Sequence, residues 1–291
     1  MLLPRSSRVP IHPLAIVSPT ATLPPGVEIG PFCIIEEGVT LGDGCRLESH
    51  VTLAEGTVLG ENNHLFQGVV VGGPPQHLQA TDQLGGVRIG SGNTLRENTT
   101  IHRAMQPGDW TTLGDDNCLM VNAHVAHDCH VGSHVVLANN VMLAGHVTIE
   151  DRAFLSGAVG VHQFCRVGRL AMVGGQARVC RDVLPFVLID GVSTAVVGLN
   201  RVGLRRAGYS AEEVTQLKAA YRLIYRSGLP WDELLDQLGR QFPKGPAACY
   251  REFCAGAKRG IVSERRLPPG ATIKLHQAET TTSAPPRRMA G

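Results

Sequence analysis

A six-residue period governs most of this 291-residue chain. Counting in sixes from Ile11 to Val179, Leu, Ile or Val fills 26 positions, and the phase survives two short interruptions. The last twelve positions, from Leu113 onward, follow without a break. If about a quarter of residues are of these types, such a run arises by chance with a probability on the order of 10⁻⁷. An α-helix of 3.6 residues per turn cannot sustain this period, whereas short strands wound into a solenoid can.

A second column lies two residues before each large aliphatic residue and holds small or short side chains. Residues i and i+2 of a strand point to the same side, so both columns face one interior. Four cysteines belong to this column and are predicted to be buried core residues: Cys33, Cys45, Cys129 and Cys165. The pattern resembles that of hexapeptide-repeat proteins. This resemblance implies a left-handed, three-sided parallel β-helix of 18 residues per coil, although ordinary crossovers are right-handed.

Two segments interrupt the period and are predicted to bulge from the solenoid as loops, near residues 72–86 and 103–110. Such insertions commonly line a binding face, and the alternative is neutral surface decoration. The β-helix is therefore expected over residues 11–185, after an N-terminal lead-in over residues 1–10. Its fold class is mainly β.

A different pattern follows the repeats, and predicts a connecting segment and a small α-helical domain over residues 186–263. Ser210 and Glu213 form a capping-box pattern, followed by apolar residues at helical spacing. Further helices are expected over residues 232–238 and 247–258. This domain would cap the open strand edges of the last coil. Residues 264–291 are rich in Pro, Thr and Arg, and are expected to be disordered.

Charge and composition exclude several classes of protein. A net charge of +2 without a basic stripe argues against nucleic-acid binding. No apolar run approaches the roughly 18 residues of a membrane span, and the N-terminal residues lack the apolar core of a signal peptide. The eight cysteines form no CxxC pair. We therefore expect a cytoplasmic protein with reduced thiols.

Histidines concentrate in the middle of the repeats, and three of them fall close to one another on successive coils. Val125, Leu143 and Val161 are 18 residues apart, and His127, His146 and His162 follow them by two, three and one positions. Asp128 could orient an imidazole for general-base catalysis. Three interpretations stay open from the pattern alone: exposed histidines without chemistry, a zinc site as in β-helical carbonic anhydrases, or a general base for acyl transfer.

Three longer runs carry a more specific resemblance: Asn122 to Cys129, Leu137 to His146, and Val161 to Phe164. With them, the chain from Ile11 to about Val262 resembles the UDP-N-acetylglucosamine O-acyltransferase family. The resemblance implies transfer of a 3-hydroxy fatty acyl group from acyl carrier protein to the sugar 3-position, the first step of lipid A biosynthesis. It also implies a homotrimer with active sites between subunits and no cofactor or metal, acyl carrier protein being a co-substrate.

The same resemblance assigns roles to individual residues. His127 matches the general base, Asp128 its acidic support, and the Gly145 N–H the donor to the oxyanion. Gly175 matches a position that limits acyl-chain length. The remaining matches are substrate contacts in the sugar, nucleotide and acyl cleft: Gln76, His77, His102, His124, His146, His162, Gln163, Asn200 and Arg206.

The chain departs from the family pattern at two places, and both affect which UDP sugar we expect it to bind. His77 and Gln79 replace an acid and a base in the first loop, and Ala207 stands where the family has a glycine after paired arginines. We therefore keep a UDP 3-amino sugar, acylated to an amide, as an alternative substrate.

The sequence also leaves room for a non-catalytic scaffold, a zinc enzyme, or the sister N-acyltransferase of the same pathway. That sister normally carries a uridine-binding domain before its repeats, which here begin at Ile11. Small O-acetyltransferases lack the runs around His127 and His162.

Overall fold

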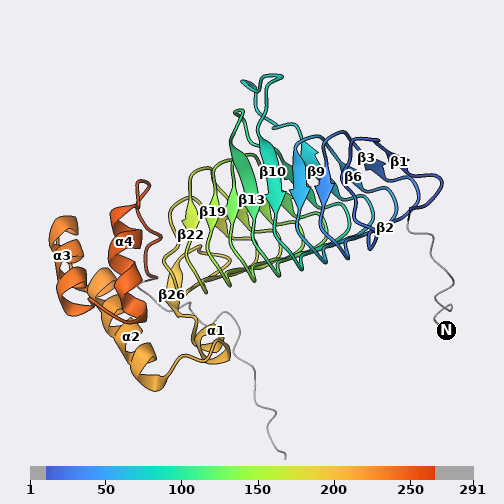
Figure 1. The fold of residues 1–291 in the computed structure, drawn as a ribbon. Helices are drawn as coiled ribbons and strands as arrows, with labels where there is room; N and C mark the ends of the chain where they lie inside the picture. The colour runs from blue at the N-terminus through green and yellow to red at the C-terminus, as the bar shows by residue number, and fades with distance from the viewer. Residues whose placement is uncertain (1–10, 266–291) are drawn as a thin grey trace, which may run out of the picture.

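The computed structural model describes residues 11–265, and it confirms the predicted left-handed, three-sided parallel β-helix with a C-terminal helical region (Figure 1). Apart from the two ends of the stack, each strand pairs with the strand three places further along the chain. The strands therefore form three parallel sheets, one on each face of the prism. Along one face Val125 is in register with Leu143, and Leu143 with Val161. The spacing of 18 residues per coil is thereby confirmed.

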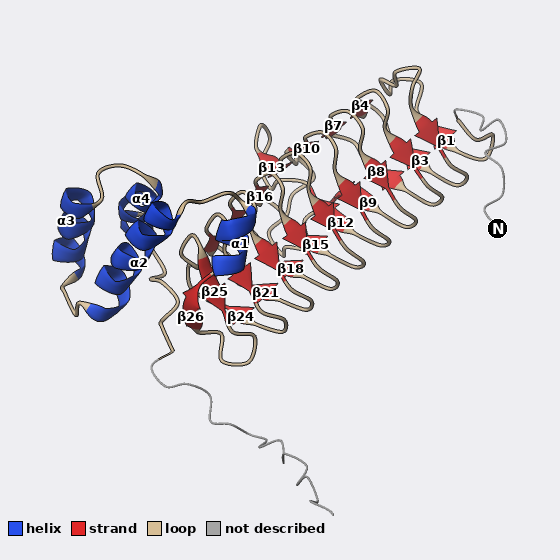
Figure 2. Ribbon diagram, turned by 90° about the horizontal axis from the view of Figure 1, so that it is seen from below, coloured by secondary structure: helices blue, strands red, loops and turns tan. Residues whose placement is uncertain are grey.

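The strands are short, and almost every one pairs in parallel with its neighbours in the sheet. The nine-stranded sheet, seen as a row in Figure 2, contains β1 (Ile16–Val17), β3 (Ile34–Ile35), β6 (Thr52–Leu53), β9 (Val70–Gly73), β12 (Thr100–His102), β15 (His124–Val125), β18 (Met142–Leu143), β21 (Gly160–Val161) and β24 (Arg178–Val179). The seven-stranded sheet contains β4 (Thr40–Leu41), β7 (Thr57–Leu59), β10 (Gly86–Ile89), β13 (Trp110–Leu113), β16 (His130–Val131), β19 (Thr148–Ile149) and β22 (Arg166–Val167). The ten-stranded sheet contains β2 (Glu28–Ile29), β5 (Arg46–Leu47), β8 (His64–Leu65), β11 (Thr94–Leu95), β14 (Cys118–Leu119), β17 (Val136–Leu137), β20 (Phe154–Leu155), β23 (Met172–Val173), β25 (Val187–Ile189) and β26 (Val196–Leu199).

The core fills the inside of the prism. From β2 onward, the large aliphatic column is buried on every coil, and the four cysteines predicted in the small column are fully buried. Outward residues alternate with them, as the strand period of two requires.

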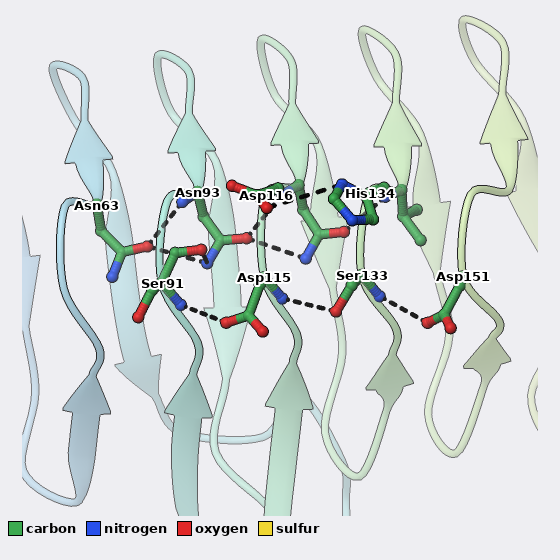
Figure 3. Close-up of polar contacts among 10 residues, drawn as sticks. Asn63, Ser91, Asn93, Asp115, Asp116, Ser133, His134 and Asp151 are labelled. Carbon is green, nitrogen blue, oxygen red and sulfur yellow. Dashed lines mark hydrogen bonds and ion pairs between the residues drawn. The ribbon is translucent and has the colours of Figure 1, made fainter. Parts of the chain in front are cut away.

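Three asparagines interrupt this apolar interior. Both the backbone N–H and the Nδ2 of Asn93 donate to Oδ1 of Asn63 at 2.9 Å, and Asn117 repeats the arrangement on Asn93 (Figure 3). The Oδ1 of Asn117 then accepts the N–H of Val135 at 2.7 Å. Each amide satisfies its neighbour, so these polar groups are buried without loss of hydrogen bonds.

A second ladder runs along the outside of the same edge. The N–H groups of Ser91, Asp115 and Ser133 each donate to the side chain one coil further on, at 2.7 to 2.9 Å (Figure 3). These bonds satisfy turn N–H groups that the sheets leave without partners, and they tie successive coils together.

The two predicted insertions are loops between β9 and β10 and between β12 and β13, and they project together from one edge (Figure 1). They bind each other through backbone bonds from Gly85 to Ala104 and from Gly86 to Asp109, both 2.9 Å. Arg103 adds a bond from its Nε to the Gly85 carbonyl at 2.8 Å.

The coils continue past residue 185, where the period had suggested their end. β25 pairs in parallel with β23, and β26 then closes the stack in the antiparallel direction. The helical region follows with α1 (Arg201–Arg206), α2 (Ala211–Arg226), α3 (Trp231–Gln241), the 3₁₀ turn η1 (Pro246–Ala248) and α4 (Cys249–Ala255). The capping box of α2 is present, with Ser210 and Glu213 bonded reciprocally.

A charged contact fastens this helical region to the β-helix. Asp182 is buried and accepts the Arg166 Nε at 2.8 Å, while the Arg166 Nη2 donates to the Phe253 carbonyl of α4 at 2.6 Å. Glu264 is also held, by the Tyr221 hydroxyl at 2.8 Å. The rest of the expected tail and the lead-in over 1–10 lie outside the described residues. Within residues 11–265, no helix has the length and apolar character needed to cross a bilayer.

Candidate active site

One outward column crosses the nine-stranded sheet through its last four strands. His124, Met142, Gly160 and Arg178 are in register on β15, β18, β21 and β24. They point outward, because the next residue on each strand is buried. Since parallel strands stack about 4.8 Å apart, this column is about 14 Å long.

His127 lies in the turn that follows β15, at the edge of this face. Its side chain is largely buried, with 10 % exposed, and its Nδ1 is 2.7 Å from Oδ2 of Asp128. A carboxylate at this distance accepts a hydrogen bond from Nδ1–H, which keeps the proton on Nδ1 and leaves Nε2 as the basic nitrogen. The arrangement is that of a general base oriented by an acid.

Asp128 is positioned by the turn and by the second loop. Its backbone is left-handed (φ 58°), a conformation that Asp tolerates better than most residues. Its N–H donates to Oγ1 of Thr111 at 2.8 Å, and its carboxylate accepts the Met105 N–H at 3.3 Å. The second insertion therefore supports the acid from behind.

Gly145 lies directly against the His127 ring. A β-carbon added to Gly145 would come within 2.6 Å of the ring's Nε2, so only glycine leaves room for the imidazole. Its carbonyl accepts the Phe164 N–H at 3.2 Å, whereas its own N–H finds no acceptor among residues 11–265. A free N–H beside the basic nitrogen suits an oxyanion donor.

Two further histidines surround His127. The His146 ring is perpendicular to it at 5.2 Å, stacks on Phe164 at 4.6 Å, and places its Nε2 3.7 Å from Asp128. The His77 ring, carried by the first loop, meets His127 edge-on at 5.5 Å. Burial lowers the pKa of His146, which favours its neutral form.

A second histidine pair links the coil of His127 to the preceding coil. The rings of His102 and His124 are 4.8 Å apart, and Nδ1 of His124 is 2.7 Å from the Thr100 hydroxyl. Burial, followed by the neighbouring His124 and His127, lowers the pKa of His102 to about 4. The pKa of His124 is lowered by burial and by His127. Both rings are therefore neutral hydrogen-bonding groups near pH 7.

These side chains border a groove of about 750 Å³ on the nine-stranded face. Seven of the predicted site residues line it: Gln76, His77, His124, His127, Gly145, His162 and Gln163. The apolar part of the lining comes from Met142, Leu143, Ala144 and Val161. His102 and His146 contact this lining through their rings, His102 against His124 and His146 against His127.

Three predicted residues lie away from this groove. Gly175 is in the turn before β24, across the face from His127, and a β-carbon there would lie 3.2 Å from the Gly157 carbonyl. Asn200 caps α1, accepting from Gly203 and donating to the Leu170 carbonyl, both at 2.9 Å. Leu170 lies in the turn between β22 and β23, on the prism edge opposite the nine-stranded face. Arg206 is exposed at the end of α1.

Met142, Gly160 and Arg178 also line the groove or its outward column, and the sequence pattern did not single them out. The signal was present, because each follows the preceding one by 18 residues, starting from His124. It was hidden because the period describes inward positions, and outward positions carry no fixed residue type.

The cluster also contains a set of possible metal ligands. Within the described chain, ligand atoms of His127, Asp128 and His146 all lie within 4.8 Å of one another. Two imidazoles and a carboxylate are suitable for zinc, so the zinc interpretation still requires a direct test.

Comparison with known proteins places the chain in a family. A family model described as UDP-N-acetylglucosamine O-acyltransferase, domain 2, matches residues 182–262, and a bacterial transferase hexapeptide model matches 20–55 and 111–145. An acyl-[acyl-carrier-protein]–UDP-N-acetylglucosamine O-acyltransferase of Janthinobacterium is 47 % identical over 258 residues, covering 87 % of this chain and 98 % of the relative. The chain belongs to this O-acyltransferase family.

Further relatives and solved structures agree. The Synechocystis member is 50 % identical over 166 residues, and this match covers 57 % of the chain. The chain spans about 60 % of the length of the Synechocystis and Gloeothece members. The UDP-N-acetylglucosamine acyltransferase structure from Francisella novicida superposes with a TM-score of 0.85 at 36 % identity, covering 88 % of this chain and 95 % of that one. The Acinetobacter baumannii structure gives 0.84 at 39 % identity, with 87 % and 100 % covered.

Proposed function

We propose that this protein is an enzyme that transfers a fatty acyl group, expected to be 3-hydroxylated, from acyl carrier protein to the 3-hydroxyl of UDP-N-acetylglucosamine, the first step of lipid A biosynthesis. One observation carries the proposal. The His127 imidazole is oriented by Asp128 at 2.7 Å, and its Nε2 faces the groove beside Gly145. Family membership supports the same reaction.

In the proposed mechanism, Nε2 of His127 takes the proton of the sugar 3-hydroxyl as its oxygen attacks the thioester carbonyl carbon. Asp128 keeps the other proton on Nδ1 and stabilises the imidazolium that forms. The Gly145 N–H would donate to the oxyanion of the tetrahedral intermediate. Collapse then breaks the carbon–sulfur bond, and the imidazolium returns its proton to the departing thiolate.

The proposal includes a homotrimer with active sites between subunits, acting in the cytoplasm. The distribution of the assigned residues supports a shared site. Asn200 is anchored at the prism edge opposite the groove, so the groove of one chain lacks this nucleotide contact. A neighbouring subunit would supply it.

A rate assay with acyl carrier protein substrates and UDP-N-acetylglucosamine tests the proposal. We expect His127→Ala to lose at least two orders of magnitude in kcat, a usual scale for a general base. The control is His134→Asn, an exposed histidine with a left-handed backbone that Asn tolerates. Full activity in His127→Ala, or none in the wild type, would refute the function. The latter result would favour a non-catalytic scaffold.

The same assay with a UDP 3-amino sugar tests the alternative substrate. His77 stands 5.5 Å from His127, close enough to contact the sugar near its reacting position. A higher kcat/KM for the amino sugar would replace the ester-forming reaction with amide formation. Metal analysis of the purified protein tests the zinc interpretation, which predicts one tightly bound ion per site and inactivation by chelators.

A further inference from the structure

The lining of the groove changes character along the helix axis. At one end lie Gln76 and His77, which offer polar contacts beside His127. Beyond His127 the outward column continues with Met142 and Gly160, which offer no polar side chain, and ends with the charged side chain of Arg178. His162 and Gln163 border this stretch in the turn that follows β21. If the proposed function holds, a sugar fits the polar end, and an acyl chain fits the floor formed by this column, which leads towards Arg178.

The floor has a notch immediately before Arg178. Gly160 lies between Met142 and Arg178 in the column, and a β-carbon added to it would meet no atom within 4 Å. About 9.6 Å therefore separates the two flanking backbone positions, since two strand spacings lie between them. Apart from the hydrogen of Gly160, no side chain fills this stretch of the column.

Arg178 is suited to close this notch. Its backbone is fixed by pairing with Gly160 and by a bond from its N–H to the Thr194 hydroxyl at 3.2 Å. Its side chain is exposed in the single chain, and among residues 11–265 its guanidinium has no acidic or hydrogen-bonding partner. An alkyl chain that passed over the guanidinium would offer this charged group no hydrogen bond, which is unfavourable.

We infer that the acyl terminus lodges over Gly160 and that Arg178 caps the groove, so that this pair limits the length of the transferred chain. This inference rests on the proposed function. It is separate from the length limit assigned by resemblance to Gly175. An added β-carbon at Gly175 would lie 3.2 Å from a backbone carbonyl, whereas the notch above Gly160 is open.

The test uses two substitutions with opposite expected effects. The full-length protein is assayed with acyl carrier proteins whose chains differ by two carbons, from well below to well above the wild-type optimum, and kcat/KM is measured for each. Arg178→Ala should favour chains two carbons longer by up to about 15-fold relative to the wild-type optimum, because each buried methylene contributes about fourfold. Gly160→Val fills the notch in a strand that accepts β-branched residues, and should shift the optimum to shorter chains.

The readout is the ratio of kcat/KM between chain lengths within each variant, which a uniform loss of activity or of folded protein does not change.

Arg178→Lys should keep the wild-type profile, because it retains a charge at the end of the groove. Arg152→Asn removes an exposed arginine from another edge, and should also keep it. Unchanged profiles in both Arg178→Ala and Gly160→Val would overturn the inference while leaving the reaction intact. Absence of activity in the wild type would overturn the proposed function itself.

Discussion

The ring of His127 occupies the space that a side chain on Gly145 would need. The nearest ring atom would be 2.5 Å from a β-carbon at Gly145, so the turn and the base are mutually dependent. Gly145→Ala should push the imidazole from its bond to Asp128 and lower kcat by about 100-fold or more, with a small effect on KM, because reacting groups must be held in near-attack geometry.

Gly157→Ala is the matched control for this substitution. It changes a turn glycine whose added β-carbon would make only an ordinary contact, 3.5 Å from the Asn139 carbonyl. Steady-state kinetics of both variants decides the point. Equal rates in the two would show that Gly145 is not required for the position of the base.

Asp128→Asn keeps the shape of the turn while removing the charge. Asn tolerates the left-handed backbone of Asp128, and its N–H can still donate to Thr111. The amide would no longer fix the proton on Nδ1 of His127 or stabilise the imidazolium. We expect kcat to fall about 10- to 1,000-fold, with the melting temperature changed by only a few degrees. A large loss of stability with normal kcat in the folded fraction would assign Asp128 to structure alone.

His102 should make folding stability depend on acidity. Its pKa is about 4 in the fold and 6.5 in the unfolded chain, so between these values only the unfolded state is protonated. Stability therefore falls as pH drops from 6.5 to 4, by up to roughly 3 kcal/mol, and this effect vanishes above pH 7. His102→Gln should flatten this dependence in urea titrations at pH 7.5, 6 and 5. An identical pH slope in the variant would contradict the assignment.

Much of the fold could be predicted from the six-residue period, because positions that face the interior of the prism accept only a few apolar residue types. Leu143 and Cys129 were placed inside the prism by position alone, and both are fully buried. The stack extends beyond residue 185 because Val187–Ile189 continues the sheet after a phase change, which a strict count in sixes cannot detect.

The site was less predictable than the scaffold. The 18-residue spacing was sufficient to bring His127 near His146. The loops follow no period, so the contacts of Met105 with Asp128 and of His77 with His127 could not be derived from spacing. The oxyanion role predicted for Gly145 came from family resemblance, whereas the close approach of this position to the His127 ring is apparent only in the structure.

The ion pair between Arg166 and Asp182 should be essential for docking the helical region. Asp182 is 1 % exposed, and Arg166 links it to Phe253 of α4. Arg166→Ala would leave a buried carboxylate without its partner, at a cost of about 3–5 kcal/mol. The double variant Arg166→Met with Asp182→Leu should lose less free energy of unfolding than Arg166→Ala alone. Chemical denaturation of the three proteins tests this order, and the reverse order would contradict it.

The asparagine ladder should stabilise the β-helix at a point where its interior is polar. Asn93 accepts two bonds from Asn117 and donates two to Asn63, so Asn93→Ala would orphan several buried groups at once. At about 1–3 kcal/mol for each unsatisfied group, the loss should reach roughly 2–5 kcal/mol. Val141→Ala is the control, since it removes an apolar side chain from the same column and should cost about 1–2 kcal/mol. Urea unfolding of both variants measures the difference. A smaller loss for Asn93→Ala than for Val141→Ala would mean that water or a shifted amide takes over the bonds, and that the ladder adds little to stability.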